Sequence, residues 1–371
     1  MKISVEKNII FKSLSHVQSI VEKKNTIPVL SNILIEAKDN SLILSATDMD
    51  ISITETLNCN IIEEGSVTVS AHTLYDIIRK LPDGNDVEFI SNDGKMFSLR
   101  SGKSKFSLSC LPKEDFPIIE ISNLKTELSI DSQFLLKLIE KTRFAISNEE
   151  TRYFLNGIYF HKKTIDNKNY LTMVATDGHR LAKIDYKVDK DIPDMPGVII
   201  PKKTINELCK LLADYSGPIN ISIDARKIIF FINSSVLISK LIDGSFPDYQ
   251  KVIPKNNNNI LTINRNDFSK AVDRVSTITN DKSPAIKFKL LKDMMNMTSI
   301  DAESGQATED INTEYKGSEI EVGFNSKYIL EMINNLEDEN ITLSFDNESS
   351  PLIATESSNP ELIYVLMPMR V

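Results

Sequence analysis

The sequence predicts an α+β protein in which one domain plan occurs three times along the chain. The first observation is a recurring segment: Ala175-Thr176-Asp177-Gly178-His179-Arg180-Leu181 has counterparts at 45–51 and 299–304. Each copy joins strand-like runs through a tight turn. The second observation is that a short apolar strand, an amphipathic helix and further strands follow each copy. The spacing of about 125 residues matches a domain with its own core and exceeds the period of solenoid repeats.

The first predicted domain covers residues 1–125. A helix is expected over 5–24, where Ile10, Leu14, Val17 and Val21 recur at helical spacing before Pro28 stops the helix. A second helix is expected over about 71–81. Alternating apolar residues predict strands at 32–37, 42–47, 51–57, 67–69, 87–89, 97–99 and 106–108. Two helices and short antiparallel runs of strands therefore make up each copy.

The second and third predicted domains cover 126–254 and 255–371. Each again has two helices, expected over 131–147 and 201–213 in the second domain and over 265–279 and 325–336 in the third. Their expected core residues are Phe134, Leu138 and Phe144, then Ile205, Leu208, Leu211 and Leu212, then Phe268, Val272 and Val275, and finally Ile329, Met332, Ile333 and Leu336.

Composition favours an ordinary globular protein of the cytoplasm. Of the 371 residues, 41% are hydrophobic and 26% are charged, and no run has the roughly 18 apolar residues of a membrane helix. Met1-Lys2-Ile3-Ser4-Val5-Glu6 does not resemble a signal peptide. The odd number of scattered cysteines, three, indicates a reducing compartment.

Charge is distributed unevenly. The net charge of −9 ordinarily argues against a nucleic-acid partner, but the six predicted helices carry more Lys and Arg than Asp and Glu. If these helices line one surface, an acidic protein presents a basic face that attracts a phosphate backbone. The alternative, that these lysines form an ordinary solvent-exposed helix face, explains the excess of Lys and Arg equally well.

The sequence contains only weak matches to motifs that would indicate an enzyme. Ser101-Gly102-Lys103-Ser104 resembles the end of a phosphate-binding loop, but Phe97 stands where that motif needs a glycine, so a hairpin turn is favoured. Asp177 and His179 could act in catalysis, yet the other copies carry Asp50 or Glu303 in place of the histidine. Such aspartates more often cap a turn. The four histidines have no paired spacing, so we expect no zinc site, no cofactor and no catalytic residue.

The C-terminus is unusually apolar. The chain ends in Ile363-Tyr364-Val365-Leu366-Met367-Pro368-Met369-Arg370-Val371, where most chains end in polar residues. We expect its first half to be a strand and its last five residues to leave apolar surface exposed. Methionine suits a surface that accepts several different peptides.

The three repeats, the Ala175–Leu181 segment, Phe246-Pro247-Asp248-Tyr249 and the Met-Pro-Met-Arg ending together resemble the bacterial beta sliding clamp family, the beta subunit of DNA polymerase III. The resemblance covers the whole length. It implies three clamp domains that form half of a six-domain ring, closed around double-stranded DNA by two chains joined head to tail. It also implies a processivity factor without catalytic activity, which tethers the replicative polymerase and other proteins through a short clamp-binding peptide. A clamp loader would open the ring.

The resemblance also assigns residues to three sites. The partner-peptide site comprises Leu155, Thr176, Gly178, His179, Arg180, Leu181, Pro247, Lys251, Val252, Asn325, Tyr328, Val365, Met367, Pro368, Met369 and Arg370. DNA contacts fall on Lys24, Glu149, Arg152, Tyr153 and Phe154, and the dimer interface falls on Phe106 and Leu108 against Ile278. Lys251 stands where the resemblance predicts arginine, and Glu149 and Phe154 stand where it predicts glutamine and tyrosine.

Two other classes of function compete with this hypothesis. One is an enzyme of nucleotide or phosphate metabolism that uses Asp177 and His179, and the other is a monomeric interaction scaffold. A ring predicts a dimer of twice 41.8 kDa that turns over no nucleotide.

Overall fold

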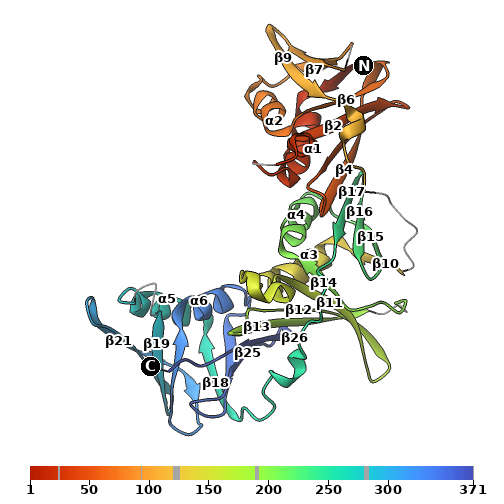
Figure 1. Ribbon diagram of the computed structural model, residues 1–371. Coiled ribbons are helices and arrows are strands. Elements are labelled where there is room, and N and C mark those ends of the chain that lie inside the picture. Colours follow the sequence, from red (N-terminus) through yellow and green to blue (C-terminus); the bar gives the residue numbers. More distant parts are fainter. Residues whose placement is uncertain (24–25, 93, 120–125, 189–191, 280–283, 371) are drawn as a thin grey trace. The chain divides into compact units, whose positions relative to one another are not determined.

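The fold is described from a computed structural model, which covers residues 1–371 except 24–25, 93, 120–125, 189–191, 280–283 and 371 (Figure 1). The chain forms two compact units. The first comprises Met1–Leu136, Pro193–Pro196 and Lys203–Leu241, and the second comprises Lys137–Ile192, Gly197–Lys202 and Ile242–Val371. All strand pairings given by the described residues are antiparallel, and together with the helices they confirm the predicted α+β class.

The first unit is built on a sheet of 13 strands in the order β10-β15-β16-β17-β4-β3-β2-β6-β9-β8-β7-β1-β5. Its strands from the first repeat are β1 (Lys2–Glu6), β2 (Asn32–Lys38), β3 (Ser41–Thr47), β4 (Ile51–Asn58), β5 (Asn60–Glu63), β6 (Gly65–Ser70), β7 (Asp86–Ile90), β8 (Met96–Ser101) and β9 (Ser104–Leu111). Its strands from the second repeat are β10 (Thr126–Asp131), β15 (Pro218–Ile223), β16 (Lys227–Ile232) and β17 (Ser235–Lys240). The Ser101–Ser104 segment is the predicted hairpin turn between β8 and β9, with Gly102 at φ +53°.

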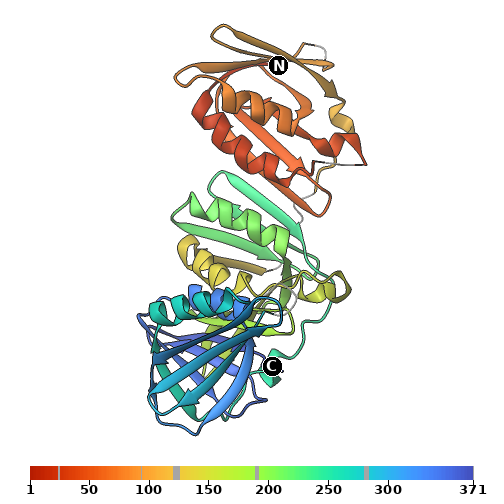
Figure 2. The same cartoon turned by 90° about the vertical axis from the view of Figure 1, so that its left-hand side faces the viewer.

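Helices α1 (Lys7–Ile20), α2 (Ala71–Lys80) and α4 (Lys202–Ala213) lie along one side of strands β2, β3, β4 and β17 (Figures 1 and 2). Two 3₁₀ turns belong to the first repeat: η1 (Pro28–Ser31) precedes β2, and η2 (Lys113–Asp115) follows β9. The apolar residues predicted to face the core from α1 and α4 are buried. In α2, Leu74 and Ile78 are buried and Ile77 is half-buried. Contact with the sheet therefore stabilises these helices more than their intrinsic propensity does.

The predicted extent of the first helix, 5–24, was too long at both ends. Val5 and Glu6 belong to β1, where they pair with Val87 and Asp86 of β7. Val5 lies about 140° around a helix from Ile10, so it does not belong to the apolar stripe. Ile3 and Val5 instead alternate on the buried face of β1. The helix ends at Ile20, while Lys24, the last residue of the predicted range, lies outside the described residues.

The second unit contains two sheets. The larger follows the order β14-β11-β12-β13-β26-β25-β24-β18-β22 and the smaller the order β21-β20-β19-β23. The strands of the larger sheet are β11 (Gly157–Ile165), β12 (Lys168–Thr176), β13 (Arg180–Val188), β14 (Val198–Pro201), β18 (Asn259–Asn264), β22 (Glu314–Tyr315), β24 (Asn340–Phe345), β25 (Leu352–Glu356) and β26 (Asn359–Leu366). Those of the smaller sheet are β19 (Ala285–Leu291), β20 (Met294–Asp301), β21 (Gly305–Asn312) and β23 (Ile320–Asn325).

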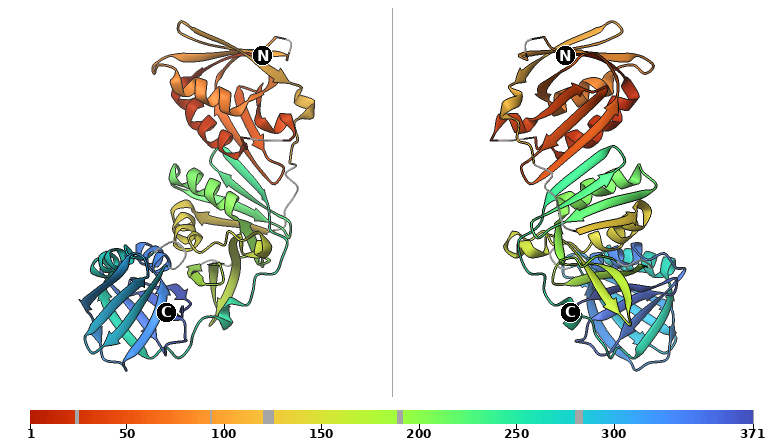
Figure 3. Two further views of the ribbon diagram at one scale, coloured as in Figure 1. Left: turned by 60° about the vertical axis from the view of Figure 1, so that its left-hand side comes forward. Right: turned by 90° about the vertical axis from the view of Figure 1, so that its right-hand side faces the viewer.

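Helices α5 (Arg265–Ser276) and α6 (Ser326–Asn334) lie side by side in the second unit (Figures 1 and 3). Asn264 and Asn325 cap them, because each side-chain oxygen accepts hydrogen bonds from backbone N–H groups of the first turn. The unit also contains the 3₁₀ turns η3 (Glu150–Leu155) and η4 (Tyr249–Lys251). The predicted core residues of both helices are buried.

Helix α3 spans Ser132–Arg143, and the prediction for its inward face was partly wrong. Leu138 is buried as expected, but Phe134 is 47% exposed and Phe144 is half-buried. The buried stripe instead runs through Leu135, Leu138, Ile139 and Thr142. This stripe has the same helical spacing as the predicted one but is rotated by one residue, which aromatic content alone cannot reveal.

The recurring segment forms the same turn in each repeat. Its aspartates, Asp48, Asp177 and Asp301, each accept two backbone hydrogen bonds from the residues two and three positions later, at 2.8–3.0 Å. They therefore cap turns, as predicted for carboxylates in this setting. The sheets then join neighbouring repeats: β4 of the first pairs with β17 of the second, and β13 of the second pairs with β26 of the third.

None of the helices in the described ranges is long and apolar enough to cross a membrane.

Candidate functional site

The turn between β12 and β13 lies at the centre of the predicted partner-peptide site. The Thr176 hydroxyl donates to the Arg180 carbonyl at 2.6 Å and accepts from the Gly178 N–H at 3.1 Å. Gly178 adopts φ +88°, a left-handed conformation that glycine tolerates best. A Cβ atom there would lie 2.5 Å from a guanidinium nitrogen of Arg152. The turn thus presents its backbone and the exposed His179 at the surface, with Arg152 beside it.

Arg180 holds this turn against α6. Its Nε donates to Asp177 Oδ2 at 3.1 Å, and its two terminal nitrogens donate to Glu331 and to the Phe144 carbonyl, the latter at 2.7 Å. The guanidinium also lies 4.3 Å from the centre of the Tyr328 ring. Because its side chain is only 10% exposed, Arg180 acts mainly by positioning the turn.

An apolar cluster lies beneath the turn. Val174, Leu181, Tyr249 and Val365 are buried together, and Leu181 pairs with Val365 across β13 and β26. The ring of Phe246 stacks on Tyr159 with centroids 4.9 Å apart and 6° between the planes. The segment after β17 is thereby fixed against the sheet, which leaves Pro247 and Val252 exposed at its surface.

The C-terminal residues continue from β26 along the same surface. The Met367 N–H donates to the His179 carbonyl at 2.9 Å, and the Met369 N–H donates to the Gly323 carbonyl at 2.8 Å. With the tail backbone fixed at both points, Met367 and Met369 keep 38% and 37% of their surface exposed. The predicted division into a strand and an exposed apolar tail is therefore confirmed as far as Arg370.

The remaining predicted residues fall into a buried and an exposed group. Leu155, Thr176, Leu181 and Val365 are buried, so they support the surface from below. Gly178, His179, Pro247, Lys251, Val252, Met367, Met369 and Arg370 are exposed, and Asn325, Tyr328 and Pro368 are half-buried. Asn325 uses its side-chain oxygen to cap α6, which leaves its amide nitrogen for a ligand. Burial raises the pKa of the Tyr328 phenol, so it stays neutral near pH 7.

Comparison with known proteins places this geometry in a family. The models for the N-terminal, central and C-terminal domains of the DNA polymerase III beta subunit match residues 1–120, 129–248 and 250–370. The chain belongs to the bacterial beta sliding clamp family.

Its relatives match over their full lengths. The chain is 41% identical to the beta sliding clamp of Caulobacter vibrioides and 32% identical to that of Escherichia coli K12, in each case over 100% of both chains. A sliding clamp from Bartonella birtlesii, solved bound to griselimycin, is 43% identical with a TM-score of 0.97 over 100% of both chains. The protein is therefore a DNA sliding clamp for DNA polymerase III, a processivity factor and not an enzyme. Membership also implies DNA, the polymerase and a second copy of the chain as partners.

The hypothesis of a catalytic Asp177–His179 pair is thus wrong for this clamp. Both Asp177 oxygens accept hydrogen bonds, from the N–H groups of His179 and Arg180 and from the Arg180 guanidinium. Within the described ranges, no cluster of three or more His, Cys, Asp or Glu side chains could hold a metal ion.

Four of the predicted DNA-contact residues lie in and beside η3 of the clamp. Arg152 pairs with Glu149 at 2.6 Å, Tyr153 is 54% exposed, and the Phe154 side chain packs against Gly244. The fifth, Lys24, lies outside the described residues. Because Arg152 also contacts Gly178, this segment touches the partner-peptide site.

The predicted dimer residues occupy edges and turns. Phe106 is 37% exposed and Leu108 half-buried on β9, and residues 104–109 of this strand pair only with β8 among the described strands. A pocket of about 400 Å³ lies beside them, lined by Ile77, Leu81 and Phe106 among others. Ile278 is half-buried just after α5.

Sequence reasoning missed several residues that build the partner-peptide site. Glu331 anchors Arg180, and the half-buried His161 pairs with the buried Tyr249 and ties η4 to β11, with His161 Nε2 3.1 Å from the Tyr249 hydroxyl. His161 Nδ1 lies 3.0 Å from the Lys162 carbonyl, which can only accept, so Nδ1 carries the proton and Nε2 accepts from Tyr249. Burial raises the pKa of Tyr249 to about 12, which keeps this donor protonated. Tyr249 belongs to the quoted Phe246-Pro247-Asp248-Tyr249 motif, but its pairing with His161 was not predicted.

Acid should loosen this part of the clamp. Burial lowers the pKa of His161 below its ordinary value, more than the Lys162 carbonyl and Asp185 raise it, while Lys163 and Lys183 lower it further. The folded state therefore binds fewer protons than the unfolded state below about pH 6.5, so stability present above that pH is lost as the pH falls. We expect the thermal midpoint of His161→Gln to fall less between about pH 7.5 and about pH 5 than that of the unchanged protein. His179→Gln, at an exposed position, serves as the control, and equal slopes for all three proteins would contradict the assignment.

Proposed function

We propose that two chains of this clamp join head to tail into a closed ring around double-stranded DNA. The observation that carries the proposal is a pair of eight-residue strands with free edges, β9 and β21. Each lacks a second partner strand along most of its length within the described part of the chain. Exposed edges of this length invite pairing with another chain.

The two edges are different surfaces, so a contact between them is heterologous. Such a contact forms a closed ring only if the rotation between neighbouring chains adds up to a full turn. Three domains per chain make six in a ring of two, and we propose the boundaries 1–125, 126–254 and 255–371, supported by one family match in each third. Charge also favours the pairing, because β9 carries Lys105 while β21 carries Glu309 and Asp310. Arg274 on α5 binds Glu309 and fixes β21 against its helix.

DNA would be held by enclosure and by weak contacts to phosphates. Many helix cations are already paired with acids, such as Lys7 with Asp83 and Lys12 with Asp214. Lys80, Arg143 and Lys270 have no such partner among the described residues, so they remain available to phosphates. Contacts to phosphates carry no base information and allow sliding, so we expect no sequence preference. We propose Lys24, Glu149, Arg152, Tyr153 and Phe154 as direct DNA contacts.

The partner-peptide site would bind the polymerase, the clamp loader and other clamp-binding proteins through a short peptide. The exposed Met367, Met369 and Val252 form an apolar surface beside the polar turn at His179. A peptide with a polar start and a leucine- or phenylalanine-rich end matches that arrangement. Such a small contact supports roughly micromolar affinity, which lets partners exchange. We place the protein in the cytoplasm, where the replication machinery of a bacterium operates.

Enclosure is tested by comparing circular with linear DNA. After loading, the clamp should remain on a circular plasmid and dissociate once a single cut opens it. Arg152→Glu should weaken direct DNA binding and reduce the slope of log K against log salt by about one. Arg226→Glu, in the exposed β15–β16 turn, is the matched control. Retention on short linear duplexes that does not depend on salt would contradict enclosure.

A further inference from the structure

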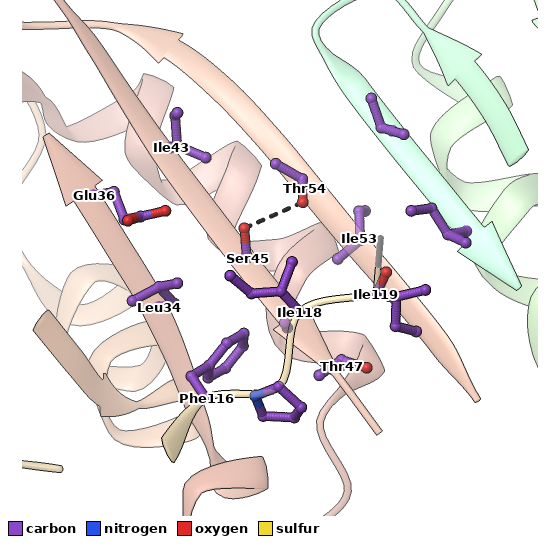
Figure 4. A pocket seen from close by; sticks show the side chains of 15 residues that line it. Leu34, Glu36, Ile43, Ser45, Thr47, Ile53, Thr54, Phe116, Ile118 and Ile119 are labelled. Atoms are coloured by element: carbon purple, nitrogen blue, oxygen red, sulfur yellow. Dashed lines mark hydrogen bonds between the residues drawn. The ribbon is translucent and has the colours of Figure 1, made fainter. Parts of the chain in front are cut away.

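The first repeat contains a pocket that no part of the clamp function described above uses. It has a volume of about 400 Å³ and lies on strands β2, β3, β4 and β17, with residues 116–119 crossing one end (Figure 4). Strand alternation places Leu34 and Glu36 on the pocket face, while Ile33 and Ile35 point to the helix side. The pocket is therefore open on the face of the sheet that the helices do not cover.

This pocket occupies the position in the first repeat that the partner-peptide site occupies in the second. The turn at its end is the same: Thr47 Oγ1 donates to the Ile51 carbonyl at 2.9 Å, as Thr176 does to Arg180 at 2.6 Å. Met49 has φ +81°, close to the +88° of Gly178.

The walls correspond as well. In the first repeat, strand β4 pairs with β17, and Ser52 lies opposite Ile238. In the second repeat, β13 pairs with β26 in the same way, and Leu181 lies opposite Val365. Phe116-Pro117 corresponds to Phe246-Pro247, and Phe116 packs with Leu34 as Phe246 stacks on Tyr159. The same repeat thus builds two surfaces from equivalent parts.

Differences in side-chain size between the two surfaces account for the open volume of the pocket in the first repeat. Where the second repeat has the buried Val174 and Leu181, the first has Ser45 and Ser52. The smaller side chains leave open the space that those apolar side chains occupy in the second repeat. The Ser45 and Thr54 hydroxyls lie 3.1 Å apart and satisfy each other across the pocket floor, so the serine does not leave an unpaired group there (Figure 4).

Glu36 gives the pocket a charge. It is the one charged side chain among the described lining residues, and it is half-buried, with no hydrogen bond or ion pair to the described residues. A carboxylate beside Leu34, Ile43 and Phe116 is less hydrated than a free one, and a cation in the pocket would pair with it. The exposed Ile118, 75% accessible, extends the apolar wall beside Ser45 (Figure 4).

We propose that this pocket is a second protein-binding site of the clamp. It would accept a short linear segment of a partner in which a leucine, isoleucine or phenylalanine follows a lysine or arginine. The apolar side chain would fill the space above Ser45 and Ser52, and the basic side chain would pair with Glu36. A volume of about 400 Å³ lies at the low end of ligand pockets, which fits one or two side chains of a peptide. The site would allow one protomer to hold two different partners.

The test uses the full-length clamp with labelled isoleucine δ1-methyl groups and follows their NMR shifts. The probe is the capped tetrapeptide Ala-Lys-Leu-Phe, and its matched control is Ala-Glu-Leu-Phe. Ile43, Ile119 and Ile238 report the pocket, while Ile253 and Ile363 report the partner-peptide site. We expect the lysine probe to shift the pocket methyls and the glutamate probe to do so at several-fold higher concentration.

Two variants make the result decisive. Glu36→Gln keeps the shape of the side chain and should weaken binding of the lysine probe by about twofold to tenfold. It should not weaken binding of the glutamate probe, because it removes a like charge. Deletion of Met367–Val371 should leave the pocket response intact, which separates this site from the partner-peptide site. Shifts confined to Ile253 and Ile363, no pocket shifts at millimolar probe, or equal affinity of Glu36→Gln would each overturn the proposal.

Discussion

Deleting Met367–Val371 should abolish binding of clamp-binding peptides while leaving the fold and the dimer nearly unchanged. The tail supplies two of the exposed apolar side chains of the partner-peptide site, Met367 and Met369. Their loss removes the apolar half of the surface that a leucine- or phenylalanine-rich peptide would cover. Binding that is only micromolar in the intact clamp would then fall below detection by fluorescence anisotropy.

The fold should tolerate this deletion because β26 ends at Leu366. The pairs of β26 with β13, Arg180 with Leu366 and Leu181 with Val365, remain. Only two described backbone hydrogen bonds are lost, from Met367 to His179 and from Met369 to Gly323. Each such bond contributes about 0.5–1.5 kcal/mol net, and water can replace them at this exposed edge. The thermal midpoint should therefore change by a few degrees at most.

A full-length variant separates side-chain from backbone effects. Met367→Ser combined with Met369→Ser keeps both backbone hydrogen bonds and removes the apolar side chains, so peptide affinity should fall by roughly 30-fold. Met96→Ser, at a 44% exposed methionine on β8 outside the site, is the matched control. Normal peptide binding by the truncated clamp would show that the site lies elsewhere, and its unfolding would show that the tail is part of the core.

Local sequence patterns predicted most of the elements of this fold. The helices with clear apolar stripes lie where periodicity placed them, because the same side chains are buried at 0–5% exposure in the structure, as for Ile10, Leu14 and Phe268. The repeated aspartate turn was equally visible, since its hydrogen bonds are made within four residues. The errors concern long-range contacts. Val5 lies in a strand because of its partner Val87, about 80 residues later in the chain.

The partner-peptide site was predicted through resemblance, and its supporting contacts were not. Arg180 was predicted as a residue of the site, but Glu331 and the Phe144 carbonyl, which enclose it, are distant along the chain. The His161–Tyr249 pair was invisible for the same reason. The pocket at Glu36 depends on the pairing of β4 with β17, which a linear pattern does not contain. Sequence thus identifies which residues are available, while sheet pairing decides which of them meet.

Phe106→Ala combined with Leu108→Ala should convert the dimer into folded monomers at micromolar concentration. Phe106 is 37% exposed on an edge strand, next to the pocket lined by Ile77 and Leu81. In the proposed ring these apolar groups are covered by the second chain, so truncation costs hydrophobic burial and leaves a cavity. Because the two side chains lie on the β9 edge and contribute little to the core of the monomer, the fold should survive.

The size of the effect follows from the symmetry of the ring. A ring of two chains joined head to tail contains the β9 contact twice, so a loss of about 3 kcal/mol per contact becomes about 6 kcal/mol per dimer. The dissociation constant should rise more than a thousandfold. Light scattering after gel filtration would then report 41.8 kDa in place of twice that mass. Met96→Ala, at a 44% exposed position on the neighbouring β8, is the matched control and should remain dimeric. If the Phe106 and Leu108 double variant also elutes as a dimer, β9 does not close the ring, and the contact must be sought at another sheet edge.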